Sequence, residues 1–262
     1  MWVLNMEARF KPRFFCAAAI EGDQVCIDGS EHQHMTKVLR LKQGESVTLF
    51  DGSGKEFEAT ISDVGRNSTR LAIEAVHEAD RELVFDLTLG VALPKGDRQQ
   101  WLVEKCVELG VSRLTPLVAT RGVAQPQGKA LDRLRRWIVS ASKQCRRNRL
   151  MDVTPAETVD QFASKAADSH VLWAHPDPHA RLLAEAIADI GKTDSISIAI
   201  GPEGGFTFEE VAAAKSAGCQ IVTLGDRILR IETAAIAIAA SLVLGRTQAQ
   251  VQGDSSTSRR PH

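Results

Sequence analysis

The chain has 262 residues, of which 44% are hydrophobic, and its formal net charge is -1. This length suits two domains with apolar cores, and without a signal-peptide pattern or a run of membrane length we expect a soluble cytoplasmic protein. The five cysteines show no Cys-x-x-Cys spacing, so the sequence indicates neither a disulfide framework nor a zinc site, and we expect small core residues.

The front of the chain is strand-like. Residues 1–12 carry no periodic pattern and are interpreted as a leader, whereas residues 13–77 predict a small β barrel or sheet. The hairpin signal Asp51-Gly52-Ser53-Gly54 separates two alternating strands. One helix, from Glu31 to Arg40 with Ser30 as its cap, is expected to place Met35, Val38 and Leu39 on one face.

A charged stretch, residues 78–82, is interpreted as the linker to a second domain at 83–247. There strand and helix patterns alternate, which predicts a mostly parallel sheet covered on both faces. The expected strands are 84–93, 111–118, 170–174, 196–200 and 220–224, and the expected helices include 99–109, 157–167, 179–190 and 234–244. The polar segment 248–262 is expected to be a disordered tail.

Positive charge is concentrated in residues 129–149, which hold eight basic residues and one acid. The segment is therefore +7, and the remainder of the chain is -8. This asymmetry is typical of a protein with a phosphate-rich partner, although a solvated helix face is the alternative. The basic residues are Lys129, Arg133, Arg135, Arg136, Lys143, Arg146, Arg147 and Arg149.

Glycines follow two expected strands in residues 196–244. Gly201, Gly204 and Gly205 come after the strand at 196–200, and Gly225 comes after the strand at 220–224. Glycines at the strand ends of an open α/β sheet favour a ligand site, although they could also serve ordinary turns. Neither G-x-G-x-x-G nor a P-loop motif occurs, so a standard dinucleotide or P-loop site is disfavoured.

Two helices are expected to follow these strands. Thr207 and Glu210 fit a capping box, and Thr233 is expected to cap a final helix from Ala234 to Leu244 that is apolar all round except at Ser241. Such a helix must be buried in its own subunit or against another. We expect a homodimer whose interface uses this helix, and a change at Ile238 would disrupt it if that residue faces the partner.

Four motifs together resemble a known family. IGPEGGF (200–206), LGDRILRIETA (224–234), LPKGDRQQWLVEKCVELGV (93–111) and RFF with HMTKVLRLKQGE (13–45) resemble the bacterial 16S ribosomal RNA uridine N3-methyltransferases of the SPOUT superfamily. The resemblance covers nearly the whole chain. It implies a PUA-like RNA-binding barrel, then a SPOUT domain with a C-terminal trefoil knot. The family more often has proline at the position of Asp226.

The resemblance also implies a cofactor, a substrate and site residues. The cofactor is S-adenosylmethionine, bound without a metal, and the substrate is a uridine in the 16S ribosomal RNA of the small ribosomal subunit. The implied cofactor-binding residues are Leu172, His175, Gly201, Glu203, Gly204, Gly205, Leu224, Gly225, Ile228, Leu229, Thr233 and Ala234. The candidate RNA-binding residues are Arg13, Lys37, Arg40, Lys42, Arg146, Arg147 and Arg149.

Arg230 and Glu232 are the catalytic candidates. Methyl transfer to N3 of uracil needs removal of the N3 proton, and the Arg230 guanidinium could stabilise the resulting negative charge. Glu232 could accept the proton, orient Arg230, or place negative charge at a helix N-terminus. Glu203 could likewise serve the cofactor or order its own loop.

Two other functions remain as alternatives. One is a non-catalytic RNA-binding ribosome assembly factor on the same fold, which the intact glycine loops disfavour. The other is an enzyme of nucleotide metabolism, which the basic segment disfavours because its substrate would be a small molecule.

Overall fold

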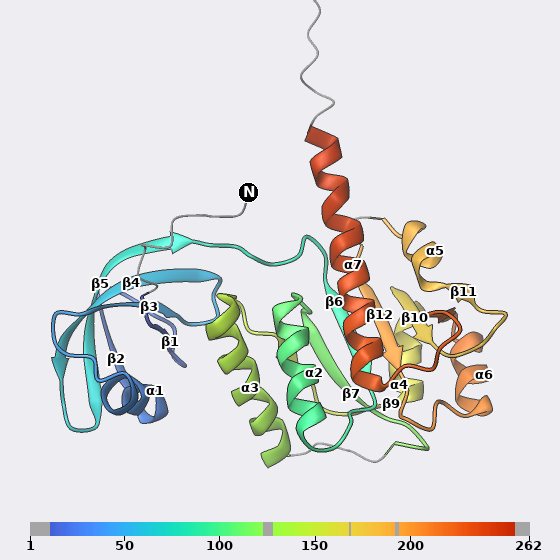
Figure 1. Cartoon of the computed structure of the whole chain (residues 1–262), viewed down its shortest axis with the longest axis horizontal. Coiled ribbons are helices and arrows are strands. Elements are labelled where there is room, and N and C mark those ends of the chain that lie inside the picture. The colour runs from blue at the N-terminus through green and yellow to red at the C-terminus, as the bar shows by residue number, and fades with distance from the viewer. Residues whose placement is uncertain (1–10, 123–127, 168, 192–193, 255–262) are drawn as a thin grey trace, which may run out of the picture. The chain divides into compact units, whose positions relative to one another are not determined.

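The computed structural model of the chain describes residues 11–122, 128–167, 169–191 and 194–254. The chain divides into two compact units (Figure 1). The first comprises Met1–Glu82 and Ser142–Leu150, and the second comprises Leu83–Ala141 and Met151–His262. The first unit is therefore built from two separate pieces of chain, which the sequence patterns do not indicate.

The first unit contains a five-stranded sheet in the order β1-β3-β4-β5-β2. The predicted hairpin is confirmed, since β3 and β4 pair antiparallel across residues 51–54. Phe14, Val47, Leu49 and Leu71 are fully buried in its core. The strands are β1 (Arg13–Phe15), β2 (Gln24–Asp28), β3 (Ser46–Phe50), β4 (Lys55–Val64) and β5 (Ser68–Glu78).

The helix of the first unit differs from its prediction. An α-helix, α1 (Gly29–Gln33), continues into a π-helical turn, η1 (His34–Val38). Ser30 therefore lies inside the first turn instead of capping it, and Asp28 at the N-cap position makes no side-chain capping bond. The wider turn buries Met35 but leaves Val38 66% exposed, because a π turn rotates later residues away from an α-helical stripe.

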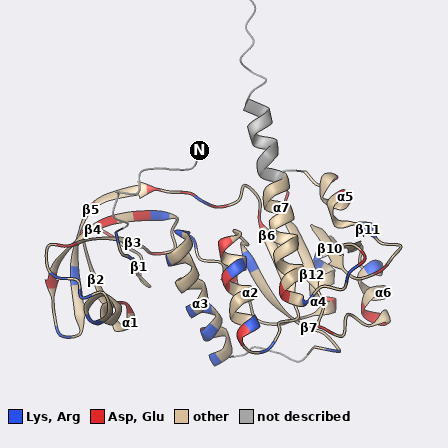
Figure 2. Ribbon diagram, in the orientation of Figure 1, with Lys and Arg blue, Asp and Glu red and all other residues tan. Residues whose placement is uncertain are grey.

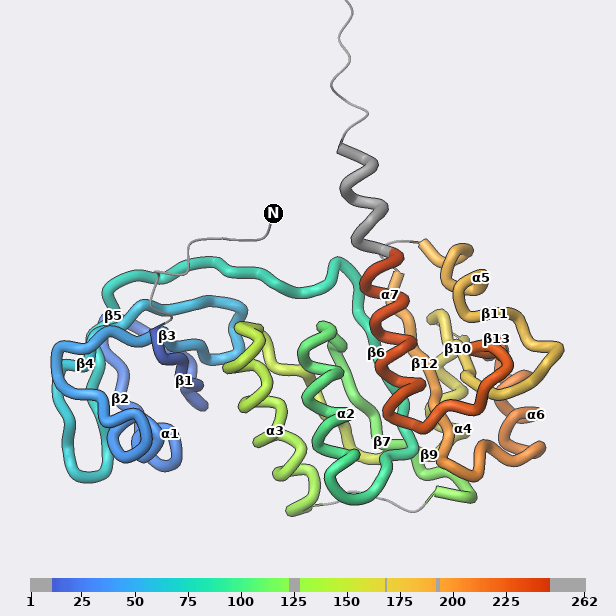
Figure 3. The backbone as a smooth tube through the Cα atoms, in the orientation of Figure 1, coloured from blue at the N-terminus to red at the C-terminus, as the bar shows by residue number. Residues whose placement is uncertain are grey.

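The second unit contains a parallel sheet in the order β11-β13-β10-β12-β6-β7-β8, and β9 also pairs with β7 (Figure 3). The predicted parallel sheet is confirmed, and two strands match their expected ranges completely, β10 (His170–Ala174) and β12 (Ile196–Ile200). The others are β6 (Leu87–Val91), β7 (Arg113–Val118), β8 (Asp152–Val153), β9 (Glu157–Thr158), β11 (Arg181–Leu182) and β13 (Gln220–Thr223).

Helices cover both faces of this sheet, as predicted. On one face α2 and α7 pack together over the strands (Figure 1). On the other face α4 and α6 enclose a core that includes Trp173, Phe162 and Phe206. The helices are α2 (Asp97–Glu108), α3 (Lys129–Cys145), α4 (Val159–Ala163), the 3-10 helix η2 (Ser164–Ala167), α5 (Leu183–Ala188), α6 (Phe208–Ser216) and α7 (Ile231–Asp254).

Two of the predicted helices are shorter than expected. The range 179–190 contains the edge strand β11 and only the short α5, because Leu182 is extended at φ -62° and ψ 139° and the strand pairs with β13. The range 157–167 similarly begins with β9 before α4 and η2. Sheet pairing at an edge has overridden local helix propensity in both places.

The final helix also differs from its prediction. It begins at Ile231, so Thr233 lies in its first turn and is not its cap. Ile238 is fully buried within its own chain, which corrects the expectation that it faces a partner. The helix continues to Asp254, so residues 248–254 are helical and the predicted start of a disordered tail at 248 is too early. Residues 255–262 lie outside the described part, as do residues 1–10 of the expected leader.

The cysteines only partly follow the expectation of core residues. Cys16, Cys106 and Cys219 are buried, whereas Cys26 is exposed and Cys145 is half-buried. Burial raises the pKa of the Cys16 and Cys106 thiols to about 12, which keeps both thiols protonated. Among the described residues, no helix is long and apolar enough to cross a membrane.

The predicted capping box of α6 is confirmed. The Thr207 hydroxyl accepts from the Glu210 amide at 3.2 Å, and Glu210 Oε2 accepts from the Thr207 amide at 2.7 Å. Glu210 Oε1 also accepts from the amide and hydroxyl of Thr120, at 2.7 and 2.9 Å. Glu210 is 8% exposed, so one carboxylate holds the helix start to the loop after β7.

We therefore predict that Glu210→Ala lowers the free energy of unfolding by about 2–3 kcal/mol, because it leaves these donors without partners. Urea denaturation measures the loss. Glu209→Ala is the matched control, since Glu209 is in the same turn but its contact with the Thr207 side chain is exposed, and it should lower the midpoint less. Equal midpoints for the two variants would contradict a special role of Glu210.

Candidate functional site

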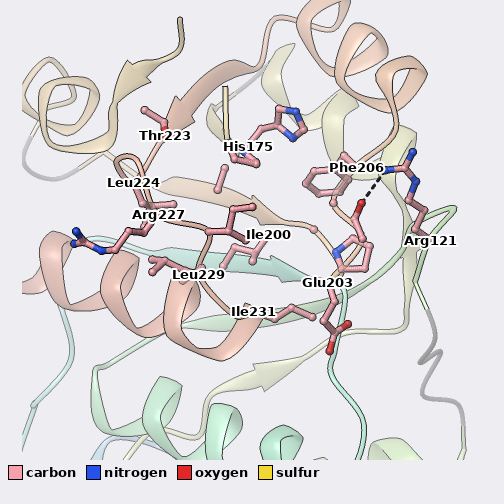
Figure 4. A pocket seen from close by; sticks show the side chains of 18 of the residues that line it. Arg121, His175, Ile200, Glu203, Phe206, Thr223, Leu224, Arg227, Leu229 and Ile231 are labelled. Carbon is pink, nitrogen blue, oxygen red and sulfur yellow. Dashed lines mark hydrogen bonds between the residues drawn. The ribbon is translucent and has the colours of Figure 1, made fainter. Parts of the chain in front are cut away.

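A cavity of about 250 Å³ lies at the carboxyl ends of β10, β12 and β13 (Figure 4). Its walls are three loops at residues 174–176, 200–206 and 223–234, together with Arg121 from the loop after β7. Such a volume approaches the lower end of small-molecule sites, which span roughly 300–1,000 Å³. The second unit therefore has a ligand-sized pocket where parallel sheets usually bind ligands.

The glycines of the 200–206 loop have distinct structural reasons. Gly205 has φ +70°, and its amide donates to the Pro202 carbonyl at 2.8 Å to close a tight turn. At Gly201 a Cβ would lie 3.0 Å from the Phe206 ring, a tight approach that would push the ring away by a few tenths of an ångström. These glycines serve turns and also leave the backbone open to the pocket. The two interpretations from the sequence, an ordinary turn and a ligand site, are therefore compatible.

Two arginines contact this loop from different elements. Arg121 donates to the Gly204 carbonyl at 2.7 Å (Figure 4). Arg98, in the first turn of α2, lies 3.2 Å from Glu203 Oε1 and 3.9 Å from Glu232 Oε1. The backbone and a carboxylate of the loop are therefore both bound to cationic side chains.

His175 is the titratable group of the first loop. Its amide donates to the Val222 carbonyl at 2.9 Å, so the loop after β10 is joined to strand β13 by a backbone hydrogen bond. Nδ1 of His175 is buried and has no hydrogen-bond partner among the described residues. Burial lowers the pKa of His175, with Asp177 opposing and Lys215 reinforcing the shift.

Most of the predicted cofactor residues lie at this pocket wall. They are His175, Gly201, Glu203, Gly204, Gly205, Leu224, Gly225, Ile228, Leu229 and Ala234. Leu172 does not line it, because it is 2% exposed inside β10, two residues before the strand ends. Thr233 also does not line it, because in the first turn of α7 it points to solvent between Ile231 and Ala234.

Sequence reasoning missed Arg121, Phe206 and Thr223, all of which line the pocket. Phe206 and Thr223 directly adjoin the predicted segments, so a boundary shift of one residue would have included them. Arg121 comes from a distant part of the chain. The parallel pairing of β6 with β7 brings the end of β7 to the same sheet edge. A polar residue shortly after a predicted strand was the sequence feature that could have identified Arg121.

The catalytic candidates Arg230 and Glu232 do not line the cavity, although Leu229 and Ile231 beside them do. Arg230 is exposed. Glu232 is 6% exposed in the first turn of α7, and its ion pair is with Arg98. The described contacts include no ion pair between Arg230 and Glu232, so the structure does not favour the hypothesis that Glu232 orients Arg230.

The RNA-binding candidates fall into two groups. Lys37, Arg40, Lys42, Arg146 and Arg149 are exposed. Arg13 is bound to Glu56 at 2.6 Å and to Asn148, with its guanidinium 4.4 Å from the centre of the Phe50 ring. Arg147 is 4% exposed and donates to both oxygens of Glu82. A phosphate could reach Arg13 or Arg147 only if these contacts opened.

The basic segment is therefore not uniformly free for a partner, although Lys and Arg positions, blue on the ribbon, are frequent along α3 (Figure 2). Lys143 binds Glu31 at 2.9 Å, and Arg135 binds Asp132 at 3.1 Å. Arg149 remains exposed against the β3-β4 turn, where a Cβ on Gly54 would lie 3.1 Å from its guanidinium. Part of the positive charge holds the fold, and part faces solvent.

The structure also settles the environment of His32 and His34, whose spacing could suggest a metal. His32 is buried, with Nδ1 2.8 Å from the Thr69 hydroxyl, and His34 Nδ1 lies 3.3 Å from Lys143 Nζ. Within the described ranges, no cluster of three or more His, Cys, Asp or Glu side chains could hold a metal ion.

Comparison with known proteins gives matches over both units. A family described as RNA methyltransferase domain matches residues 81–243, and a family described as RNA methyltransferase PUA domain matches residues 27–74. The chain is 32% identical to a ribosomal RNA small subunit methyltransferase E of Synechocystis over 80% of its length and 69% of the relative's. It is 31% identical to the protein of that name from Rickettsia conorii, over 86% and 92% of the two chains.

Solved structures of similar proteins are consistent with these sequence matches. A Legionella pneumophila methyltransferase in complex with the bound cofactor SAM aligns with a TM-score of 0.82 and 31% identity, over 90% of this chain and 98% of that one. A ribosomal RNA small subunit methyltransferase E from Neisseria gonorrhoeae bound to S-adenosyl methionine aligns with a TM-score of 0.80 and 31% identity, over 88% and 96% of the chains.

The lowered pKa of His175 generates a prediction about pH. Because the unfolded chain takes up a proton at this position near pH 6.5 and the folded chain only at lower pH, folding loses stability as the pH falls below about 6.5. His175→Asn removes this contribution. The melting temperature of the wild type relative to the variant should therefore fall between pH 7.5 and pH 5.5. If the melting temperatures of both proteins change in parallel over that pH range, the lowered pKa of His175 is contradicted.

Proposed function

The chain belongs to the family of RNA methyltransferases that join a methyltransferase domain to a PUA domain, and we propose that it is a cytoplasmic S-adenosylmethionine-dependent methyltransferase of small-subunit ribosomal RNA. The observation that carries the proposal is the pocket built by three strand-end loops in the second unit. Two structures of similar proteins are described as bound to that cofactor.

The pocket fits a flat, polar cofactor with an apolar part. Gly205 and Gly225, both at positive φ with open space where a Cβ would stand, expose backbone N–H and C=O groups that can bind an adenine edge. Leu224 and Leu229 add apolar walls, and the Nδ1 atom of His175 has hydrogen-bonding capacity to spare. When bound, S-adenosylmethionine supplies an electrophilic methyl group.

We propose N3 of a uridine as the acceptor. A neutral imide nitrogen has no available lone pair, so the site must stabilise a uracil that has lost its N3 proton. Arg230 is exposed beside the pocket-lining Leu229 and Ile231, where its guanidinium can donate to the uracil oxygens as negative charge develops. Glu232 is buried in the first turn of α7, which favours its role in charge placement over proton acceptance.

The exposed basic residues of the first unit are proposed to position the RNA. Lys37, Arg40, Lys42, Arg146 and Arg149 can contact phosphates, which fix register without reading sequence. Sequence-specific RNA recognition usually targets unpaired bases, so we propose a uridine in a loop or irregular helix of 16S ribosomal RNA.

We also propose that the enzyme is a homodimer through α7. The outward side of this helix carries small or apolar side chains at Ala237, Ala240 and Leu244, and Leu244 is 64% exposed. Small residues allow close helix packing, and Ile238 on the opposite side is already buried in the monomer. Light scattering of the unmodified protein at micromolar concentration tests this association, and a monomer there would exclude it.

We predict that the protein binds S-adenosylmethionine in the presence of a chelator and methylates uridine N3 in small ribosomal subunits. Ligand at a hundredfold excess over its Kd stabilises the folded state by about 2.7 kcal/mol, which a thermal shift detects. Binding to RNA without a thermal shift or methylation would favour the assembly-factor alternative instead.

Gly205→Ala should abolish that thermal shift. Its matched control is Gly44→Ala, because both glycines have positive φ and open surroundings, at +70° and +87°, but Gly44 lies in the first unit. Each change strains the backbone by about 1–2 kcal/mol. Only Gly205→Ala should lose cofactor binding, and a loss in both would indicate general destabilisation.

A further prediction separates the exposed arginine from the internally bound one. Arg149→Glu should weaken RNA binding and reduce its salt dependence by a slope of about 1, without lowering stability. Arg147→Glu should instead destabilise the fold by about 3–5 kcal/mol, because it leaves Glu82 beside a like charge in a largely buried pair. Salt-dependent binding assays and denaturation measure these effects. An unchanged salt slope for Arg149→Glu would remove it from the RNA interface.

A further inference from the structure

Arg98 contacts two of the elements that form the pocket. It lies in the first turn of α2, at 3.2 Å from Glu203 in the glycine loop and 3.9 Å from Glu232 in α7. All three residues belong to the second unit. The guanidinium therefore links the loop after β12 to the start of the final helix.

The glycine loop is contacted on two sides. Arg121 binds the Gly204 carbonyl from one side, and in Figure 4 the Glu203 carboxylate lies on a different side of the loop, near Ile231. The contact with Arg98 holds that carboxylate. Because Gly204 and Gly205 themselves have no side chains, the orientation of this loop depends on such neighbouring contacts.

The Glu232 carboxylate depends on Arg98 for its countercharge more strongly than the Glu203 carboxylate does. Its side chain is 8% exposed, and its Oε2 atom has no hydrogen-bond partner within the described part of the chain. The distance of 3.9 Å from its Oε1 atom to the Arg98 guanidinium is too long for a hydrogen bond but within ion-pair range. A buried carboxylate needs a countercharge. Among the described ion pairs, the cation that contacts Glu232 is Arg98.

We propose that Arg98 is a positioning residue that fixes the glycine loop and the first turn of α7 in the geometry required for cofactor binding and methyl transfer. This inference rests on the proposed function. Loss of Arg98 releases the side chain of the pocket-lining Glu203 and leaves Glu232 buried without its cation. Both pocket walls then relax together, although Arg98 itself does not line the cavity.

The test compares Arg98→Gln, Arg98→Lys and the wild type, with Lys105→Gln as the matched control. Lys105 lies on the same helix and forms a partly exposed ion pair with Glu108 at 2.7 Å, far from the loop in sequence. Calorimetry gives the Kd for S-adenosylmethionine, and steady-state assays with small ribosomal subunits give kcat and KM. Hydrogen exchange of the ligand-free protein reports on peptides 200–206 and 228–236.

For Arg98→Gln we expect a Kd about fivefold higher, the size of a partly exposed ion pair. At saturating cofactor kcat should fall about tenfold while KM for the subunit is unchanged, because the lost contacts act on the reacting geometry. Exchange should rise in both peptides, and the melting temperature should fall, because Glu232 is left buried without its countercharge. Arg98→Lys should recover part of kcat, since it keeps the charge but cannot reach both carboxylates as a planar fork does.

The Glu203→Gln background provides an internal check. If Arg98 acts on cofactor binding through Glu203, adding Arg98→Gln to that background should raise Kd less than twofold, because interacting residues are not additive. Full additivity would overturn the proposal, and so would unchanged Kd, kcat and exchange in Arg98→Gln. A wild type that fails to bind S-adenosylmethionine would instead contradict the proposed function, so the two failures are distinguishable.

Discussion

Parallel strand pairing is the constraint from which the site follows. β12 and β13 both pair with β10, and the register sets Ala174 opposite Ile200 and Val222. All three strands therefore release the chain at one edge of the sheet, and segments that are far apart in sequence become neighbours. The tight turn at Gly205 and the backbone bond from His175 to Val222 are local responses to that crowding.

Charge has two separate uses in this chain. Arg98, Arg121 and Arg147 bind acceptors of the protein itself, and each holds together segments that are distant in sequence. Arg149 and Lys42 stay in solvent. The amino-acid composition does not distinguish these two groups. Only the exposed residues can bind a polyanion without first breaking a contact within the protein.

The sequence correctly predicted those helices and strands whose ends are defined by residues close to them in the chain. β10, β12 and α6 agree with the sequence because an apolar run, a glycine or a capping box defines each of them. The π turn at His34–Val38 and the start of α7 at Ile231 depend on tertiary packing and were missed. The pocket loops were found largely through the motifs that resemble the family. Arg121 and Arg98 were not, because their partners lie about a hundred residues away.

The buried pair between Arg147 and Glu82 has a consequence for biosynthesis. It belongs to a unit whose second piece, Ser142–Leu150, is translated only after the first part of the other unit, Leu83–Ala141. On the ribosome, the N-terminal sheet must therefore wait for that piece before Arg13 meets Asn148 and Glu82 meets its cation. A fragment ending at Glu82 would lack Asn148 and Arg147, so we expect the sheet on its own to lose these contacts and to be less stable than in the whole chain.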